Sequence, residues 1–274
     1  MIERLDARVD EIRKKIKGVE DKKVASEVFD KSTLLTLWEL ANKGAIDLLY
    51  GVIKTGKESN VFLGKGKKGE PLAVKIHRIT TSDYKSMIRY MDGDYRFRGI
   101  RKSKRSIVYT WVKKEFKNLK VAGECGIAAP KPIAYKNNVL IMEFVGEDEV
   151  SSPMLRSCWL RNPEEVLNKI VEYVKKLYCE GNLVHSDLSE YNILIKDEQP
   201  VFIDFSQAVI KEHPTAQEFL KRDVANIAKF FRKHTTCASK YTDESEILSY
   251  VAECKKPRVK TRFSALHQQA FQTT

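Results

Sequence analysis

The sequence predicts an α+β protein of two lobes, because five strand patterns with one helix among them come before a mainly helical half. Short alternating apolar runs bounded by turn residues indicate the strands, and apolar residues spaced three and four apart indicate the helices. In chain order we expect helices at 3–23 and 32–42 (N-cap Ser32), strands at 48–53, 60–64 and 71–76, a helix at 106–122, strands at 132–135 and 139–144, and helices at 163–180, 215–234 and 243–254.

Four segments follow from this pattern. Residues 1–45 are an N-terminal helical extension, and residues 46–145 are a first lobe with a flexible basic insertion at 78–106. Residues 146–254 are the second lobe. Residues 255–274 are basic and then polar with little periodicity, which predicts a loosely held tail.

Composition favours an ordinary globular protein, with 42% hydrophobic and 31% charged residues in 274. No apolar run approaches the length of a membrane span, and the charged N-terminus lacks a signal-peptide core. We therefore expect a cytoplasmic protein with no membrane partner. The five cysteines are scattered and odd in number. This predicts reduced, buried thiols rather than a zinc site or a disulfide framework.

The net charge of +12 and the pI of about 9.3 indicate an acidic partner such as nucleic acid. Residues 78–114 hold eleven Lys and Arg against three Asp, with tyrosines, a phenylalanine and a tryptophan between them. Cations interleaved with aromatic rings suit RNA. The alternative is a solvated loop without a ligand. Ser103 and Ser106 lie among these cations as candidate autophosphorylation sites.

Three polar side chains suited to phosphate chemistry lie beside two short apolar runs. Asp187 and Asn192 precede the run 193–195, and Asp204 ends the run 201–203. If the two runs pair as a hairpin, the three side chains meet at one edge. In phosphoryl transfer one carboxylate orients the attacking hydroxyl or water, while an amide oxygen and a second carboxylate hold Mg²⁺. The alternative is a polar loop that caps a hairpin.

A lysine and a glutamate in the first lobe predict a phosphate-binding pair. Strand alternation places Lys75 beside Ala73, opposite the apolar face, which suits a cleft wall as well as a solvent-facing edge lysine. Glu115 shares the buried stripe of its helix and needs a cation there. We expect Lys75 to be that cation. The alternative pairs Glu115 with Lys114 or Lys117 at the surface.

Two further segments suit the ends of a nucleotide. The loop between the first two strands can aim backbone N–H groups at phosphates at Gly56, and Lys57 and Ser59 can add side-chain contacts. That loop holds a single glycine and is not a full G-x-G-x-x-G motif. Glu143 and Val145 end the fifth strand, where free backbone groups are placed to read an adenine edge.

Together these residues resemble the protein-kinase superfamily and, within it, the type-1 branch of the RIO family of atypical serine kinases. The resemblance covers about residues 28–235. It is carried by Thr-Gly-Lys-Glu-Ser-Asn at 55–60, Ser-Asp-Leu-Ser-x-Tyr-Asn at 186–192, Ile-Asp-Phe-Ser-Gln at 203–207 and His-Pro…Arg-Asp-x-x-Asn-Ile at 213–227. It implies a kinase-like fold with a five-stranded antiparallel sheet in the first lobe and a reduced, mainly helical second lobe.

The resemblance also implies roles and partners. Asp187 is then the catalytic base, Asn192 and Asp204 bind Mg²⁺, with Mn²⁺ as a possible substitute, and Lys75 binds ATP with Glu115 as its partner. The implied activity is transfer of the γ-phosphoryl group to serine, autophosphorylation included, or to water. Some family members phosphorylate the metal-binding aspartate, which implies a transient phosphate on Asp204. The implied partner is the small ribosomal subunit, its RNA or its proteins.

The sequence departs from ordinary protein kinases in ways that bear on control. Ser186 stands where most have arginine, and no Ala-Pro-Glu motif follows Asp204, so control by activation-loop phosphorylation is not expected. Asp223 is expected to accept N–H bonds from the catalytic loop, or else to pair with Arg222 or Lys221.

Two other functions use similar residues. Small-molecule kinases of the aminoglycoside or choline type share the His-x-Asp-x-x-x-x-Asn and Ile-Asp patterns, but they usually carry a larger acidic substrate pocket than this second half offers. A non-catalytic, nucleotide-binding ribosome-assembly scaffold is the other alternative, although every catalytic position is filled. The oligomeric state is not predicted.

Overall fold

The computed structural model describes residues 29–79, 84–97, 99, 103–234, 237 and 239–254. The predicted helix at 3–23, part of the insertion at 78–106 and the predicted tail at 255–274 lie outside the described residues. None of the helices in the described ranges is long and apolar enough to cross a membrane.

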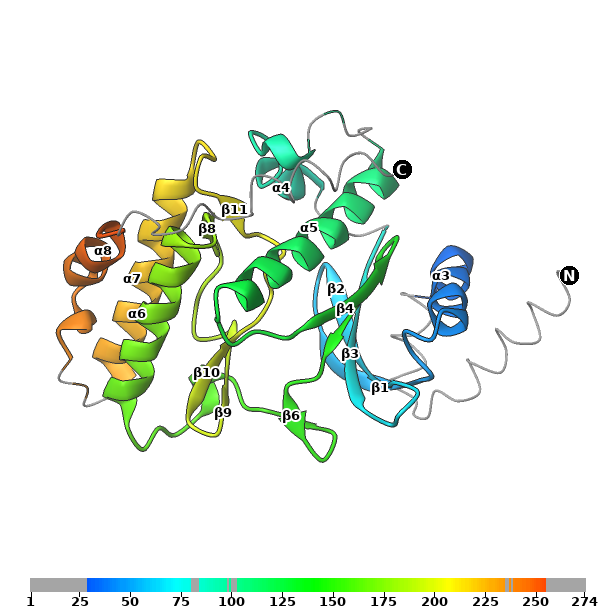
Figure 1. The fold of residues 1–274 in the computed structure, drawn as a ribbon, viewed down its shortest axis with the longest axis horizontal. Coiled ribbons are helices and arrows are strands. Elements are labelled where there is room, and N and C mark those ends of the chain that lie inside the picture. The colour runs from blue at the N-terminus through cyan, green and yellow to red at the C-terminus, as the bar shows by residue number, and fades with distance from the viewer. Residues whose placement is uncertain are drawn as a thin grey trace, which may run out of the picture.

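A five-stranded antiparallel sheet forms the first lobe, in the order β1-β2-β3-β5-β4 (Figure 1). Its strands are β1 (Leu48–Thr55), β2 (Ser59–Lys65), β3 (Pro71–His77), β4 (Pro132–Lys136) and β5 (Val139–Glu143). Because β3 pairs with β2 on one side and β5 on the other, its lysine lies on a central strand. The alternative of an edge-strand lysine in solvent is therefore wrong.

The two faces of the sheet pack against different helices. Leu72, Val74 and Ile76 of β3 belong to a small apolar cluster with α3 (Lys31–Asn42), which covers the outer face. Ala73 faces the opposite side, where the core is continuous with that of the second lobe. Figure 1 shows α3 and α5 (Lys104–Glu124) on opposite sides of the sheet. The predicted alternation along β3 is confirmed.

The helices of the first lobe begin slightly earlier than predicted, each directly after a residue that caps its first turn. For α3 the N-cap is Asp30 rather than Ser32, and its carboxylate accepts the Thr33 N–H at 2.8 Å. Helix α5 (Lys104–Glu124) follows Ser103, whose hydroxyl accepts a backbone N–H of the first turn. Both caps satisfy N–H groups that the first turn leaves without a helical partner.

Part of the predicted insertion is folded against the lobes. It contains α4 (Tyr84–Arg89) and the short 3₁₀ helix η1 (Tyr95–Phe97). Met87, Asp94 and Arg96 are buried. This part of the insertion therefore packs against the neighbouring structure rather than extending into solvent.

Helices dominate the second lobe, in which α8 packs across α6 and α7 (Figure 1). Its elements are β6 (Gly146–Glu147), β7 (Val150–Ser151), η2 (Leu155–Ser157), α6 (Pro163–Cys179), β8 (Leu183–Val184), β9 (Ile193–Lys196), β10 (Gln199–Phe202), β11 (Val209–Ile210), α7 (Ala216–His234), η3 (Lys240–Thr242) and α8 (Glu244–Ala252). Buried apolar residues of α6 and α7 share one core with those of the short strands, which anchors the loops between the strands.

The predicted hairpin of the second lobe is present. Strand β9 pairs with β10 in antiparallel register, with Ile193 opposite Phe202. Asp197 and Glu198 form its turn with positive φ values of 51° and 59°, as a tight hairpin turn requires. The hairpin therefore brings the residues before β9 and after β10 to one edge.

The prediction of reduced cysteines is wrong for one pair. Cys179, at the end of α6, forms a disulfide with Cys254, just beyond α8, and their Cα atoms lie 5.3 Å apart. An odd number of cysteines shows only that not all of them can pair within the chain, so it does not exclude a single disulfide. Cys125 and Cys158 remain free thiols, and Cys125 is buried as expected.

Candidate active site

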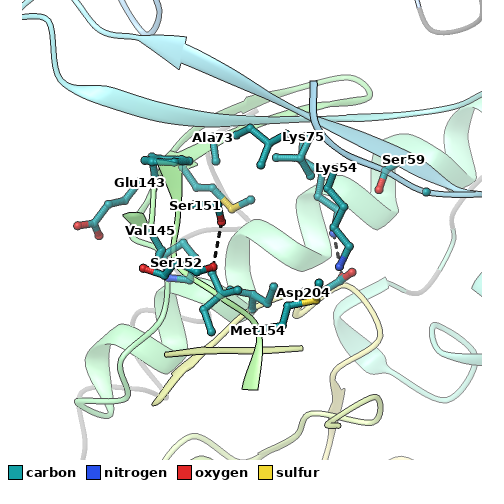
Figure 2. A pocket seen from close by; sticks show the side chains of 18 of the residues that line it. Lys54, Ser59, Ala73, Lys75, Glu143, Val145, Ser151, Ser152, Met154 and Asp204 are labelled. Atoms are coloured by element: carbon teal, nitrogen blue, oxygen red, sulfur yellow. Dashed lines mark hydrogen bonds and ion pairs between the residues drawn. The ribbon is translucent and has the colours of Figure 1, made fainter. Parts of the chain in front are cut away.

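A cavity of about 420 Å³ lies between the two lobes. Figure 2 shows Ala73 and Lys75 on the sheet side of this cavity, with Met154 and Asp204 on the opposite side. The predicted site residues that line it are Gly56, Ser59, Lys75, Glu115, Glu143, Val145 and Asp204. Asp187, Asn192 and Lys57 are not among its lining residues.

The predicted lysine–glutamate pair is present and has a third member. Lys75 Nζ donates to Glu115 Oε1 at 2.7 Å and to Asp204 Oδ1 at 2.8 Å. Lys75 and Glu115 are buried, whereas the Asp204 side chain is 38% exposed toward the cavity. The alternative that pairs Glu115 with Lys114 or Lys117 at the surface is therefore wrong.

These contacts stabilise the charged forms of the cation and of the aspartate. Burial disfavours the ammonium of Lys75, but the attraction of Asp204 and Glu115 outweighs burial and raises the pKa of Lys75 above its ordinary value. Burial likewise opposes the charge on Asp204. Lys75 and the Ser206 hydroxyl, which donates at 2.7 Å, nevertheless hold the pKa of Asp204 well below its ordinary value.

Asp187 and Asn192 contact each other in the loop before β9. Asn192 Nδ2 donates to the Asp187 carbonyl at 2.8 Å and to its Oδ2 at 3.0 Å. Gln207 Nε2 also lies 3.3 Å from that oxygen. Burial, and then the negative charge of Asp204, raise the pKa of Asp187 to about 6. Asp187 is therefore mostly ionised at neutral pH, yet it is a stronger base than an ordinary aspartate.

The side chain of Asp223, on α7, binds the backbone of this loop. Its carboxylate accepts the Ser186 N–H at 2.7 Å and the Leu188 N–H at 2.9 Å, as predicted. Burial raises the pKa of Asp223 to about 7 against the effect of these two bonds. Ser186 has a positive φ of 65°, a conformation that a serine keeps only when its surroundings impose it.

The oxygens of Asn192 and Asp204 suit a hard cation such as Mg²⁺. Both amide hydrogen bonds of Asn192 use its nitrogen, which turns the amide oxygen away from Asp187. The partly exposed Asp204 carboxylate offers a second ligand. Over the described ranges, no three His, Cys, Asp or Glu side chains gather into a metal site. A cation here would thus also need phosphate oxygens and water.

The loop between β1 and β2 reaches the cavity only in part. Gly56 and Ser59 line it, whereas Lys57 is exposed and outside the lining. A Cβ at Gly56 would lie 2.9 Å from the Ser59 carbonyl oxygen, so the tight turn requires glycine. Lys54, which the sequence analysis did not single out, lines the cavity instead.

The strand that joins the lobes borders an apolar slot. Ala73 and Leu194 line it from different lobes. The Glu143 N–H donates to the Lys131 carbonyl at 2.9 Å, and the Val145 carbonyl accepts the Ser152 N–H at 3.0 Å. Figure 2 shows the Glu143 carboxylate pointing away from the cavity.

Sequence reasoning missed four side chains around the two aspartates: Ser206, Gln207, Lys114 and Asn118. Ser206 and Gln207 lie within the quoted Ile-Asp-Phe-Ser-Gln segment, so that motif was the available signal. Lys114 and Asn118 are buried polar residues of α5 that contact the loop after β10. Only the three-dimensional packing reveals them.

The fold and the site together define a kinase-like protein. A strand-rich lobe carries the pair Lys75–Glu115, and a helical lobe carries the Asp187–Asn192 loop and Asp204, which faces the cavity. A model of the RIO domain matches residues 60–244. The chain is 48% identical over 223 residues to the RIO-type serine/threonine-protein kinase Rio1 of Methanocaldococcus jannaschii, and the match covers 81% of this chain and 76% of that protein. The chain therefore belongs to the RIO domain family of serine/threonine-protein kinases.

Two solved structures are similar in fold. The Rio2 kinase from Chaetomium thermophilum matches with a TM-score of 0.63 and 24% identity, over 88% of this chain and 73% of that chain. The Rio2 kinase-ADP/Mg²⁺-phosphoaspartate complex from the same organism matches with a TM-score of 0.58 and 25% identity, over 87% and 74% of the two chains. The first likeness supports the kinase-like fold alone.

Proposed function

We propose that this protein transfers the γ-phosphoryl group of MgATP to a serine hydroxyl or to water. The observation that carries the proposal is the convergence of Lys75, Glu115 and Asp204 on a cavity of nucleotide size. The second Rio2 structure is a complex with ADP and Mg²⁺, which supports the same ligands here. Nothing in the comparisons supports Mn²⁺.

In this proposal Asp187 acts as the catalytic base. Its raised pKa of about 6 leaves it ionised at pH 7 and able to accept a proton from the attacking hydroxyl. Asn192 and Gln207 both contact Oδ2 of the carboxylate, so we assign the proton to the other oxygen, Oδ1. Asp223 keeps the loop backbone in place while this happens.

Lys75, Asn192 and Asp204 bind the phosphate end of the nucleotide in the same proposal. Mg²⁺, when bound, neutralises charge on the β- and γ-phosphates. Lys75 exchanges its bond to Asp204 for phosphate oxygens while Glu115 keeps its ammonium in position. Gly56 and Ser59 offer backbone and hydroxyl donors, and the slot at Glu143 and Val145 takes adenine.

We further infer that Asp204 is transiently phosphorylated. A carboxylate oxygen attacks the γ-phosphorus, the bond to the β–γ bridging oxygen breaks, and ADP leaves. Water then cleaves the acyl phosphate, releasing phosphate and restoring the carboxylate. The phosphoaspartate of the Rio2 complex supports this step. We expect an acid-stable, hydroxylamine-labile phosphate on Asp204, whereas label found only on hydroxyl groups would exclude the step.

The proposed macromolecular partner is the small ribosomal subunit or its RNA and proteins, in the cytoplasm. Lys85, Arg89, Lys104 and Arg105 are exposed cations of the basic segment. Lys104 Nζ lies 5.1 Å from the ring of Tyr84, so charge and aromatic surface occur together. Binding to RNA should weaken steeply with salt, because phosphate contacts release counterions. Affinity that is insensitive to salt contradicts an RNA partner.

The test of the function is a turnover experiment with γ-labelled ATP, with and without small ribosomal subunits. Asp187→Asn is the matched inactive control. Phosphate release stimulated by the subunits supports an ATPase, and label on a protein supports a kinase. Label that moves to an aminoglycoside or choline supports the small-molecule alternative. Nucleotide binding with no Asp187-dependent turnover in any arm supports the scaffold.

A further inference from the structure

Two buried side chains of α5 hold the backbone of the loop after β10. Lys114 Nζ donates to the carbonyls of Ser206 and Ala208 at 2.8 and 2.6 Å. Asn118 Nδ2 donates to the carbonyls of Phe205 and Ala208, both at 3.0 Å. Carbonyl groups of three loop residues are thus fixed to a single helix.

These bonds lie deep in the protein rather than at the cavity. Lys114 and Asn118 have no exposed surface, and neither lines the cavity. Burying the ammonium of Lys114 costs free energy, because it removes the charge from water. Burial, and then the charge of Arg96, accordingly lower the pKa of Lys114 well below its ordinary value. Its two carbonyl partners would lose a buried donor without it.

The loop that these bonds hold is in an unfavourable conformation. Asp204 has a positive φ of 62°, in the left-handed region that residues with side chains seldom adopt. Such a conformation persists only where neighbouring structure imposes it. The ring of Phe205 is fully buried, and its centroid lies 4.7 Å from that of His185, so the loop also packs against the residue that follows β8.

The folded part of the insertion completes the arrangement. Arg96 Nη1 donates to Asn118 Oδ1 at 3.0 Å, which orients the amide so that its nitrogen faces the loop. Asp94 in turn holds the guanidinium, with Arg96 Nη2 donating to its Oδ2 at 2.7 Å. All three side chains are buried.

We propose that Lys114 and Asn118 are positioning residues that hold Asp204 in its cavity-facing conformation, with Asp94 and Arg96 setting the orientation of Asn118. The inference rests on the proposed function of Asp204 as a metal ligand. Glu115, which holds Lys75, lies on the same helix. A single helix, α5, therefore positions both Lys75 and the loop that carries Asp204.

The test uses Lys114→Met and Asn118→Asp in the full chain. Asn118→Asp keeps an acceptor for Arg96 and removes both donors to the loop. Lys120→Met is the matched control, because it makes the same change on an exposed face of α5. Two readouts are measured: hydrogen exchange of the peptide 203–209 without nucleotide, and ADP binding by calorimetry with Mg²⁺ and with a chelator.

We expect exchange of 203–209 to accelerate in both variants and the Mg²⁺-dependent part of ADP affinity to fall about 10–100-fold, the usual effect of losing support for a metal ligand. ADP binding in chelator should change less than the binding with Mg²⁺, because adenine and Lys75 contacts remain. Lys120→Met should match the wild type. Variants that fold, exchange and bind MgADP as the wild type does would overturn the proposal.

If Lys114→Met fails to fold, the exchange and ADP-binding results of Asn118→Asp alone test the proposal. The exchange measurement needs no nucleotide, so it also separates the two proposals. Faster exchange of 203–209 in the variants, together with a wild type whose ADP affinity does not depend on Mg²⁺, supports the positioning role of Lys114 and Asn118 and overturns the metal role of Asp204.

Discussion

Lys75 Nζ lies 2.8 Å from Asp204 Oδ1, although the two residues are 129 positions apart and belong to different lobes. The lysine also contacts Glu115 at 2.7 Å, so one ammonium holds two carboxylates. This ion pair joins the two lobes across the cavity.

Replacing Lys75 by methionine should lower the free energy of unfolding by about 3 kcal/mol, because it leaves a buried carboxylate without its cation. Most of this loss should come from Glu115, because its side chain is only 1% exposed and its charge would be left unpaired with Lys75. The double variant Lys75→Met/Glu115→Met should be more stable than Lys75→Met alone. Chemical denaturation measures both, and Lys54→Met, an exposed lysine at the same cavity, is the control. Strictly additive losses would show that the two charges are not coupled.

Replacing Asp187 by asparagine should lower turnover about 10²–10⁴-fold, the usual range for a positioned base. In the wild type, turnover should rise with pH through about 6 and then level off, because the raised pKa of Asp187 keeps it protonated below that value. A pH profile of kcat/KM from 5 to 8 measures this. A profile that is flat across pH 6, or an Asp187→Asn variant as active as the wild type, contradicts the role.

The same pKa predicts a stability change of known sign. Folded Asp187 binds its proton more tightly than in the unfolded chain, so its contribution favours the folded state in acid and is lost as pH rises through about 6. The stability of Asp187→Asn relative to the wild type should therefore increase between pH 4 and pH 7. Denaturation curves at the two pH values test it, and an opposite trend would place the pKa of Asp187 below its unfolded value.

Much of this site could be predicted from local patterns. The two-residue alternation of β3 separates Lys75 from the apolar face, and the helical spacing places Glu115 on a buried stripe, where its carboxylate needs a cation. The turn between β9 and β10 is short enough to predict the hairpin that brings Asn192 and Asp204 together. Each of these predictions depends on residues close in sequence.

The rest depends on contacts between distant segments. Lys114 looks like one of many surface lysines in a basic stretch, and only the approach of a loop 92 positions away gives it partners. Asn118 carries no sequence signal for the same reason. The cap at Asp30 was missed because Ser32 and Asp30 are both good N-cap residues, and tertiary packing chooses between them.

Replacing Asp204 by alanine should abolish the dependence of nucleotide binding on Mg²⁺, since the cation has few protein ligands here. Calorimetry with ADP should give similar affinities with Mg²⁺ and with chelator for this variant, and different ones for the wild type. Ser189→Ala, in the loop before β9 and outside the cavity lining, is the control. Retained Mg²⁺ dependence in Asp204→Ala would exclude Asp204 as a ligand.

The disulfide between Cys179 and Cys254 should contribute about 4 kcal/mol to stability, because it closes a loop over a separation of 75 residues in the unfolded chain. Reductant should lower the denaturation midpoint of the wild type and leave the double variant Cys179→Ser/Cys254→Ser unaffected. Cys158→Ser, which removes a free thiol, should behave as the wild type in both conditions.

Turnover of the folded protein should be insensitive to reductant, since neither cysteine lines the cavity. If native protein is alkylated at all five cysteines without prior reduction, the pair is not oxidised and the expected stabilisation is absent.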